Sequence, residues 1–572
     1  MRLALVAPRP LTLLAPARPV LNNVLLLKFA DRSTEEERSR LHHELDLAIK
    51  LKSDLRARIN ALNTVCRLPA EVLVKIFRYL PELEYSYTRY KEVEGKQVVI
   101  PRALNLGWIL VTHVCKYWRR VALEKSGLWT RICFSLGSEW AAQMMERSKT
   151  APLTIADSYE TRKFHPHVGR LTSSHLSHTR KLHFYLPLET LTQLLSSLVD
   201  AAPILHKLCL LARSGSVVMV SKTFLDQHSP NLREMTLRNV SIPLTSSLFR
   251  KLEHLEMEFS VGFRHGQTIR DPPCAPTLPG LLDMLRTMLG MKVLKLSQSA
   301  IPAAATATPG LNSVSLPSLV SILLAGWPAD MAALLTHVEL PRVASFSLGD
   351  IHGADTGDYQ ALFSALSTHL SRSGGQGPLA MTGLKIRDQV IKMAISGHRG
   401  VDMPNNFYET AENVFTIEFH AIYGRMEKAI PAFLTTLPLQ DLVSLKFVGM
   451  RCYPVGGHWR DALHCLPNIR FLEVYTQELD AILEFLREGT EEAAIFPHLE
   501  MLSIRFVYFS TSKEEKQRRT RRLLSAVLRM RWLHGHPLQK LELRGDGPDS
   551  IDADWLARLR RLVAEVVVEA LS

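Results

Sequence analysis

Cysteine is scarce in this sequence, and its seven cysteines are scattered without a Cys-x-x-Cys pair. An odd number at such wide spacing argues against a disulfide framework, so a reducing compartment is expected. Long apolar runs are missing as well, and no stretch approaches the roughly 18 residues that span a bilayer. We therefore expect a cytoplasmic or nuclear protein without membrane contact.

Motifs that carry catalysis or hold cofactors are also lacking. The sequence has no Gly-x-Ser-x-Gly elbow and no nucleophile beside an identifiable base. Gly374-Gly375-Gln376-Gly377 lies in a polar loop rather than between a strand and a helix, so it lacks the context of a phosphate loop. Two histidine and cysteine groups lack the paired spacing of metal ligands; they are Cys452, His458, His464 and Cys465, and His165, His167, His175 and His178. We predict no enzyme, no catalytic residue, no cofactor and no metal.

The first 30 residues contain no acidic side chain and several prolines. The prolines interrupt any helix or apolar segment, so the resemblance to a targeting leader is loose. We expect residues 1–32 to be a disordered tail.

What the sequence does contain is the composition of a folded protein, with 46% hydrophobic and 22% charged residues. A length of 572 residues exceeds one ordinary core, so several domains or a repeat array are expected. The formal charge of +13 fits nucleic acid, an anionic membrane or an acidic protein, and charge alone does not choose among them. The basic run 513–522 suits a nuclear-import signal or a phosphate contact, although a solvated helix face is favoured.

Residues 33–65 are predicted to form an amphipathic helix. The segment opens with Ser33 and three glutamates, which favour a helix start. Its apolar residues recur at three- and four-residue steps; they are Leu41, Leu45, Ala48, Leu51, Leu55, Ile59 and Leu62. Docking of this helix on the next domain is favoured over a short coiled coil, because about three heptads are few for a dimer.

Two further helices are expected over residues 66–134, separated by a polar loop insertion at 82–103. The first follows Pro69, which suits a first helical position, and ends near Pro81. The second begins near Leu106, and Leu128 and Trp129 follow it. Apolar residues at helical spacing mark both helices.

The order Leu-Pro-x-Glu-Val-Leu-x-x-Ile-Phe-x-x-Leu, a loop, Val-x-x-Val-Cys-x-x-Trp-Arg-x-Val-Ala and Leu-Trp resembles the F-box family, in particular its fungal type. This resemblance implies a helical module that binds a Skp-type adaptor and, through it, a cullin ubiquitin-ligase scaffold. It assigns adaptor binding to the matching positions: Leu68, Pro69, Leu73, Ile76, Phe77, Leu80, Val111, Val114, Cys115, Trp118, Leu128 and Trp129.

After residue 150 an apolar pattern Leu-x-x-Leu-x-Leu recurs. Copies include Leu205/Leu208/Leu210, Leu232/Met235/Leu237, Leu319/Ile322/Leu324, Met381/Leu384/Ile386 and Leu538/Leu541/Leu543. Proline precedes many copies by two residues, where it would end a helix and start an extended segment. The fold class expected is mixed α+β or α/β: a helical F-box-like module followed by an irregular leucine-rich-repeat-like solenoid of parallel strands over 150–572.

Residues 552–571 are predicted to be an amphipathic helix that caps the solenoid. The runner-up architecture is an irregular α/β domain. Three functions are compared: a substrate receptor that joins an adaptor to an unknown protein substrate, a repeat-based scaffold without a ligase role, and, less favoured, a basic nucleic-acid-binding protein.

Overall fold

The computed structural model describes most of the chain. The described residues are 32–83, 87–93, 96–157, 167–213, 217–225, 228–260, 262–264, 267–269, 274–307, 310–341, 345–350, 356–371, 381–387, 390–395, 416–421, 426–448, 457–475, 479–488, 495–507, 514–545 and 552–570. The tail predicted at 1–32 lies almost wholly outside them. The chain divides into two compact units, Met1–Tyr85 with Gly107–Lys125, and Ser86–Leu106 with Ser126–Ser572.

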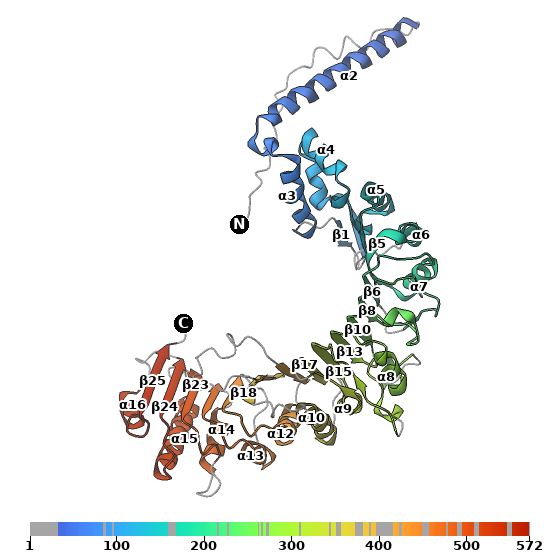
Figure 1. Ribbon diagram of the computed structural model, residues 1–572. Helices are drawn as coiled ribbons and strands as arrows, with labels where there is room; N and C mark the ends of the chain where they lie inside the picture. The colour runs from blue at the N-terminus through green and yellow to red at the C-terminus, as the bar shows by residue number, and fades with distance from the viewer. Residues whose placement is uncertain are drawn as a thin grey trace. The chain divides into compact units, whose positions relative to one another are not determined.

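The first unit is helical. Its elements are α2 (Arg32–Ala61), the 3-10 helix η1 (Thr64–Arg67), α3 (Ala70–Leu83), the 3-10 helix η2 (Gly107–His113) and α4 (Lys116–Glu124). The helix predicted at 33–65 and the helix predicted after Pro69 are therefore found at α2 and α3 (Figure 1).

The second predicted helix is two helices. A 3-10 segment, η2, covers Trp108 and Val111, and α4 begins only at Lys116. Cys115 separates them: its backbone is extended, and its sulfur accepts a hydrogen bond from the Trp118 amide. That contact satisfies one of the amides that a helix N-terminus leaves open, so the new helix begins here.

The insertion predicted as a loop at 82–103 forms an antiparallel hairpin instead. Its strands are β1 (Tyr87–Val93) and β2 (Lys96–Asn105). Val98, Val99 and Ile100 are β-branched residues in succession, which favour a strand. The polar composition of the segment concealed this preference.

The second unit is built on one long sheet. Its strands are β3 (Arg131–Cys133), β4 (Leu153–Asp157), β5 (Thr179–Leu186), β6 (Lys207–Ala212), β8 (Glu234–Arg238), β10 (His254–Phe259), β13 (Val293–Gln298), β15 (Ser321–Gly326), β17 (Ser345–Asp350), β18 (Met381–Arg387), β19 (Val390–Ile395), β20 (Thr416–Ala421), β21 (Ser444–Val448), β22 (Phe471–Tyr475), β23 (Met501–Val507), β24 (Lys540–Gly545) and β25 (Glu565–Ala570). From β3 to β17 every pair of neighbours is parallel.

Helices connect many of these parallel strands, as parallel pairing requires. They are α5 (Ser138–Ser148), α6 (His167–Ser174), α7 (Leu188–Ser197), α8 (Leu278–Arg286), α9 (Pro328–Thr336), α10 (Thr356–Ser371), α12 (Met426–Thr436), α13 (Gly457–His464), α14 (Leu479–Glu488), α15 (Glu514–Leu533) and α16 (Ala553–Leu559). In Figure 1 helices such as α7 and α8 lie on one side of the row of strands. Among their described residues, the connections from β6 to β8, β8 to β10 and β13 to β15 contain no α-helix. The short strands and 3-10 helices of the unit are β7 (Val218–Met219), β9 (Val240–Ser241), β11 (Gly262–Arg264), β12 (Gln267–Ile269), β14 (Val314–Ser315), β16 (Val338–Glu339), η3 (Ser126–Leu128), η4 (Phe134–Leu136), η5 (Leu176–His178), η6 (Ser247–Phe249) and η7 (Ala304–Thr306).

The core is a ladder of equivalent residues from successive strands. The last two apolar positions of the predicted pattern pair directly across neighbouring strands, as Leu294 does with Ile322 and Leu296 with Leu324. Buried residues alternate with less buried ones along β10, β13 and β15. A strand in a two-layer fold buries alternate residues because successive side chains point to opposite faces. The last two apolar residues of each Leu-x-x-Leu-x-Leu copy therefore lie on the face of the sheet that the helices cover.

Polar side chains in the segments between strands form hydrogen bonds to backbone carbonyls in the turn that precedes a neighbouring strand. The Asn231 amide donates to the Pro203 carbonyl at 2.8 Å, and the Asn468 amide donates to the Gln440 carbonyl at 2.7 Å. Arg531 is buried and donates to the Phe496 carbonyl at 3.0 Å. These contacts satisfy turn carbonyls that have no strand partner.

The strand order departs from sequence order near the middle of the sheet. β17 pairs in parallel with β20, while β19 pairs antiparallel with both β20 and β18, and β18 then pairs in parallel with β21. The copy Met381/Leu384/Ile386 is therefore not the neighbour of β17, as a simple repeat array would make it. Only two undescribed residues separate β18 from β19, and so short a connection suits antiparallel strands.

The helix predicted at 552–571 is only half right. Asp552 caps α16 by accepting hydrogen bonds from the Asp554 and Trp555 amides, and the helix ends at Leu559. The remainder forms β25, parallel to β24. Val566, Val567 and Val568 explain the change, because three successive β-branched residues favour a strand.

None of the described helices has the length and apolar character needed to cross a membrane.

We predict that Leu324→Ala destabilises the second unit. The side chain is fully buried between Leu296 and Leu348 of the neighbouring strands, and removing it leaves a cavity that costs about 2–5 kcal/mol. Urea unfolding followed by circular dichroism should show a lower midpoint. Val320→Ala, four residues earlier and exposed, is the control; an equal shift for both would contradict the ladder.

Candidate functional site

Helix α3 carries two apolar stripes that face different environments. Leu73 and Phe77, four residues apart, are 1% and 0% exposed. Val72, Ile76 and Tyr79 form a second stripe and are 39%, 45% and 68% exposed. A small helical module buries one stripe of such a helix in its own core. The second stripe is surplus apolar surface, the usual sign of a binding site.

The buried stripe is held by α4. The Phe77 and Trp118 rings meet edge to face, with centroids 5.2 Å apart. The Tyr117 hydroxyl donates to the Leu68 carbonyl at 2.8 Å and so fixes the start of α3 against α4. Edge-to-face aromatic pairs and a satisfied carbonyl each stabilise the packing of the two helices.

Helix η2 extends the exposed apolar surface of this unit. Trp108, Ile109 and Val111 are buried, whereas Leu110 and Val114 are 52% and 54% exposed. The tight winding of a 3-10 helix places successive side chains on different faces, so one short segment serves both core and surface. We call Val72, Ile76, Tyr79, Leu110 and Val114 the exposed apolar set.

Two thiols lie at the junction of these helices. The sulfurs of Cys66 and Cys115 are 3.9 Å apart, and burial is the main cause that raises the pKa of the Cys66 thiol. Beside them the indole N–H of Trp118 is buried and has no hydrogen-bond partner among the described residues. An unpaired buried donor of this kind is costly and rare in folded proteins.

The twelve positions that the family resemblance assigned to adaptor binding divide by burial. Leu73, Phe77, Val111, Leu128 and Trp129 are buried, and Leu128 and Trp129 lie in the second unit, where the Arg147 guanidinium stands 4.5 Å above the Trp129 ring. The remaining assigned residues keep some or much of their surface exposed: Leu68, Pro69, Ile76, Leu80, Val114, Cys115 and Trp118.

Three residues of the exposed apolar set were not predicted. Val72 and Tyr79 precede and follow Ile76 at helical spacing, and Leu110 precedes Val114 by four residues. The sequence contains a signal for these residues: a helix with apolar residues on two faces has more apolar surface than one core can bury, so one of the faces is expected to be exposed.

The prediction that α2 docks on the next domain is wrong along its apolar stripe. Leu41, Leu45, Leu55 and Ile59 are all exposed. A salt bridge of 2.8 Å between Asp54 and Lys116 ties α2 to α4, and this hydrogen bond lowers the pKa of Asp54. Asp54 points away from the stripe, because at about 100° per residue it lies roughly 130° around the helix from the stripe's midline. The attachment therefore leaves the stripe uncovered within the described residues.

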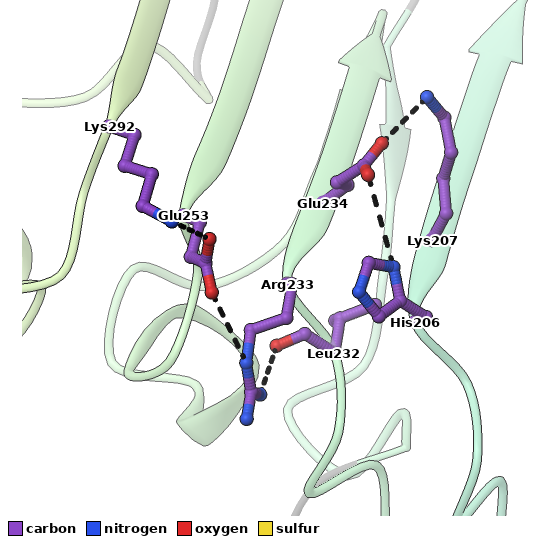
Figure 2. Close-up of polar contacts among 7 residues, drawn as sticks. All are labelled: His206, Lys207, Leu232, Arg233, Glu234, Glu253 and Lys292. Carbon is purple, nitrogen blue, oxygen red and sulfur yellow. Dashed lines mark hydrogen bonds and ion pairs between the residues drawn. The ribbon is translucent and has the colours of Figure 1, made fainter. Parts of the chain in front are cut away.

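The sheet of the second unit presents a charged face opposite its helices. Lys207 on β6 pairs with Glu234 on β8 at 2.8 Å, and Glu253 lies between Arg233 and Lys292 at 3.7 and 2.6 Å (Figure 2). The hydrogen bond from Lys207 lowers the pKa of Glu234, and that from Lys292 lowers the pKa of Glu253. Both acids are thus held in their charged form.

The same arrangement recurs toward the C-terminus. Glu473 pairs with Lys446 at 2.6 Å and with Arg505 at 2.8 Å, and Glu542 pairs with Lys540 at 2.9 Å and Arg544 at 3.1 Å. Glu542 is only 3% exposed. Lys446, Glu473 and Arg505 come from three neighbouring strands, whereas Lys540, Glu542 and Arg544 share β24, so pairs across strands and along one strand neutralise the face locally. The face offers charges of both signs to a partner without an excess of either.

Sequence reasoning did not identify these charged residues. Those on the strands occupy the positions between the apolar residues of the Leu-x-x-Leu-x-Leu pattern, where period-two alternation turns side chains to the other face. Arg233, Glu253 and Lys292 directly precede β8, β10 and β13. Glu234, Glu256, Glu473 and Glu542 all stand at such positions.

The discounted sites gain no geometric support. Among the described residues no three His, Cys, Asp or Glu side chains come together as a metal site would need. Cys452, His165 and the glycine run 374–377 lie outside the described residues. The basic run largely falls in α15, where Arg519 pairs with Glu484 at 2.5 Å.

Comparison with known proteins assigns a family to the segment that carries the exposed apolar set. The chain contains an F-box-like domain, because the family model described as F-box-like matches residues 65–135. No curated protein matches the chain. Among solved structures, the crystal structure of the Rad7 and Elc1 complex in yeast is similar at 12% identity and a TM-score of 0.29, covering 85% of this chain and 96% of that chain.

We predict that Phe77→Ala and Ile76→Ala have different effects on stability. Phe77 is fully buried against Trp118, and its removal should cost about 3–5 kcal/mol, whereas the half-exposed Ile76 should cost much less. Thermal unfolding followed by near-ultraviolet circular dichroism, which reports on Trp118 packing, tests this. Equal losses for both variants would contradict the two-stripe description of α3.

Proposed function

We propose that this protein is the substrate receptor of a Skp-cullin-F-box ubiquitin ligase. The observation that carries the proposal is the F-box-like domain at 65–135 together with exposed apolar side chains on two of its helices. F-box domains bind Skp-type adaptors through apolar helical surface, and the adaptor joins them to a cullin.

The adaptor-binding surface proposed here is narrower than the sequence alone suggests. It consists of the exposed apolar set with Leu68, Pro69 and Leu80 nearby in sequence and partly or fully exposed. Apolar side chains form the desolvated centre of protein interfaces, and tyrosine, here Tyr79, is enriched among the residues that carry most of the binding energy. The buried residues Leu73, Phe77 and Val111 act indirectly, by holding α3 and η2 in place.

At the substrate end we propose an irregular leucine-rich-repeat-like solenoid. The support is the succession of parallel strands in one register, with a buried apolar ladder and inter-turn asparagine contacts. The charged face of the sheet is the surface proposed to bind a protein substrate. Its paired charges of both signs suit a polar protein surface better than nucleic acid, which selects for an excess of cations.

No catalytic role is proposed for the chain. Its part in ubiquitin transfer is to hold the substrate near the ligase, within the cytoplasm or nucleus. The alternatives are a repeat-based scaffold without adaptor binding and a basic nucleic-acid-binding protein. The first predicts a stable protein that purifies without an adaptor, and the second predicts binding that falls steeply with salt.

We predict that Ile76→Asp with Tyr79→Asp abolishes co-purification of a Skp-type adaptor. Each aspartate would bring an unpaired carboxylate into an apolar interface, at a cost sufficient for at least a hundredfold loss of affinity. Affinity purification of the full chain, followed by identification of bound proteins, is the measurement.

The control for this experiment is Val199→Asp, because Val199 is 75% exposed and lies outside the F-box-like domain. Both proteins should unfold at the temperature of the unchanged protein. Adaptor recovery that is the same in all three proteins, or absent from the unchanged protein, would favour the scaffold.

A further inference from the structure

The longest helix of the first unit has an apolar stripe that no described residue covers. The stripe is defined by residues three and four apart along α2 and the turn that follows; they are Leu41, Leu45, Ala48, Lys52, Leu55, Ile59 and Leu62. Five of them are large aliphatic side chains, each between 47% and 71% exposed. A helix that keeps such a stripe in water forgoes the burial that normally stabilises it.

Charge is distributed unequally along the same helix. Residues 32–47 carry five acids and three bases, whereas residues 48–61 carry four bases and one acid. Two such helices laid side by side in opposite directions would place the acidic half of each against the basic half of the other. In the same direction, like halves would meet. The opposed helix dipoles favour the first arrangement as well.

From the exposure of this stripe and the charge segregation along it, we propose that α2 pairs with α2 of a second copy of this chain in an antiparallel two-helix coiled coil. The stripe has the heptad spacing of such a coil, with Leu45, Lys52 and Ile59 at one core position and Leu41, Ala48, Leu55 and Leu62 at the other.

The single polar residue of the stripe fixes the direction. In a parallel pair Lys52 would face Lys52 of the second copy at the same layer, and two cations would share one core position. In the antiparallel register that places Leu45 opposite Leu55, Lys52 faces Ala48 of the second copy. The small alanine leaves room for the lysine stem to pass and its ammonium to reach water. A lone polar core residue commonly selects one register in this manner.

The same register pairs charges at the rim of the stripe. Glu44 of one copy lies beside Arg58 of the second copy, and the symmetric pair repeats the contact. Among the residues that the structure describes, Glu44 of one chain has only a loose pair with Arg40, at 3.5 Å and largely exposed, so it is available to a second copy. Leu51, at the centre, faces its own counterpart and adds apolar contact.

The attachment of α2 to the rest of its unit is compatible with this pairing. Asp54, which pairs with Lys116, points away from the stripe. The exposed apolar set lies on α3 and η2, so self-association and adaptor binding use different elements of the unit.

The test is a charge swap in the full-length chain, measured by sedimentation equilibrium over a dilution series. Glu44→Arg sets two arginines against each other at both symmetric contacts, since its neighbour is Arg58 of the second copy, and should raise the dimer dissociation constant about tenfold or more. Arg58→Glu should do the same. The double variant restores opposite charges and should return the constant to near its original value.

Asp46→Arg is the matched control, since it makes the same charge change in the same half of the helix but off the stripe. It should leave the dissociation constant within about twofold of the unchanged value. A full-length chain that is monomeric throughout the series overturns the proposal, as does a dimer that Glu44→Arg leaves unchanged or that the double variant fails to restore.

The outcome is separable from that of the adaptor proposal. Glu44→Arg should leave adaptor co-purification unchanged, and Ile76→Asp with Tyr79→Asp should leave the dimer unchanged. Either function can therefore fail while the other stands.

Discussion

The parallel register of the sheet is the constraint on which the second unit depends. Each strand places its two buried apolar residues beside those of its neighbours, so that Leu255 pairs with Met235 on one side and Leu294 on the other. A shift by one residue would turn every buried side chain to the charged face. Because the register holds from strand to strand, the alternate residues also line up, and the cross-strand ion pairs of the open face follow from the same constraint.

The first unit solves a different problem, because it is too small to bury all of its apolar residues. Its core is the contact of Phe77 with Trp118 and the buried part of η2. Leu73 and Val121 are buried there as well, whereas other apolar side chains remain at the surface, on the outer stripe of α3, around η2 and along α2. Small helical modules commonly complete their apolar burial with a partner. The same helices therefore carry buried core residues on one side and exposed apolar residues on the other.

The sequence was most informative where periodicity and local chemistry agree. The F-box-like segment was bounded at 66–134 and is matched at 65–135, and the Leu-x-x-Leu-x-Leu copies gave the buried positions of the strands. Secondary-structure prediction from the sequence failed where the strand preference of a few residues was hidden by their neighbours, and strand order could not be predicted where distant residues determine the pairing. Polar neighbours concealed the hairpin at 87–105, and Val566 to Val568 ended a predicted helix. The reversed strand order around β19 depends on a long-range pairing that no local pattern encodes.

Burial was the other quantity that the sequence could not supply for the candidate site. Leu73 and Ile76 are both apolar and three residues apart on one helix, and the packing of α4 and η2 on α3 separates a core residue from a surface residue. The same reasoning applies to α2, where apolar spacing alone fits docking and self-pairing equally. Because the apolar stripe of α2 is exposed, the described residues of the same chain do not cover it. Self-pairing remains, and the contact of Lys52 with Ala48 of the second copy favours the antiparallel direction. A paired α2 would bring two F-box-like domains and two sheet faces into one assembly. A substrate with two binding sites would then be held by both faces, and the second contact would form at a high effective concentration.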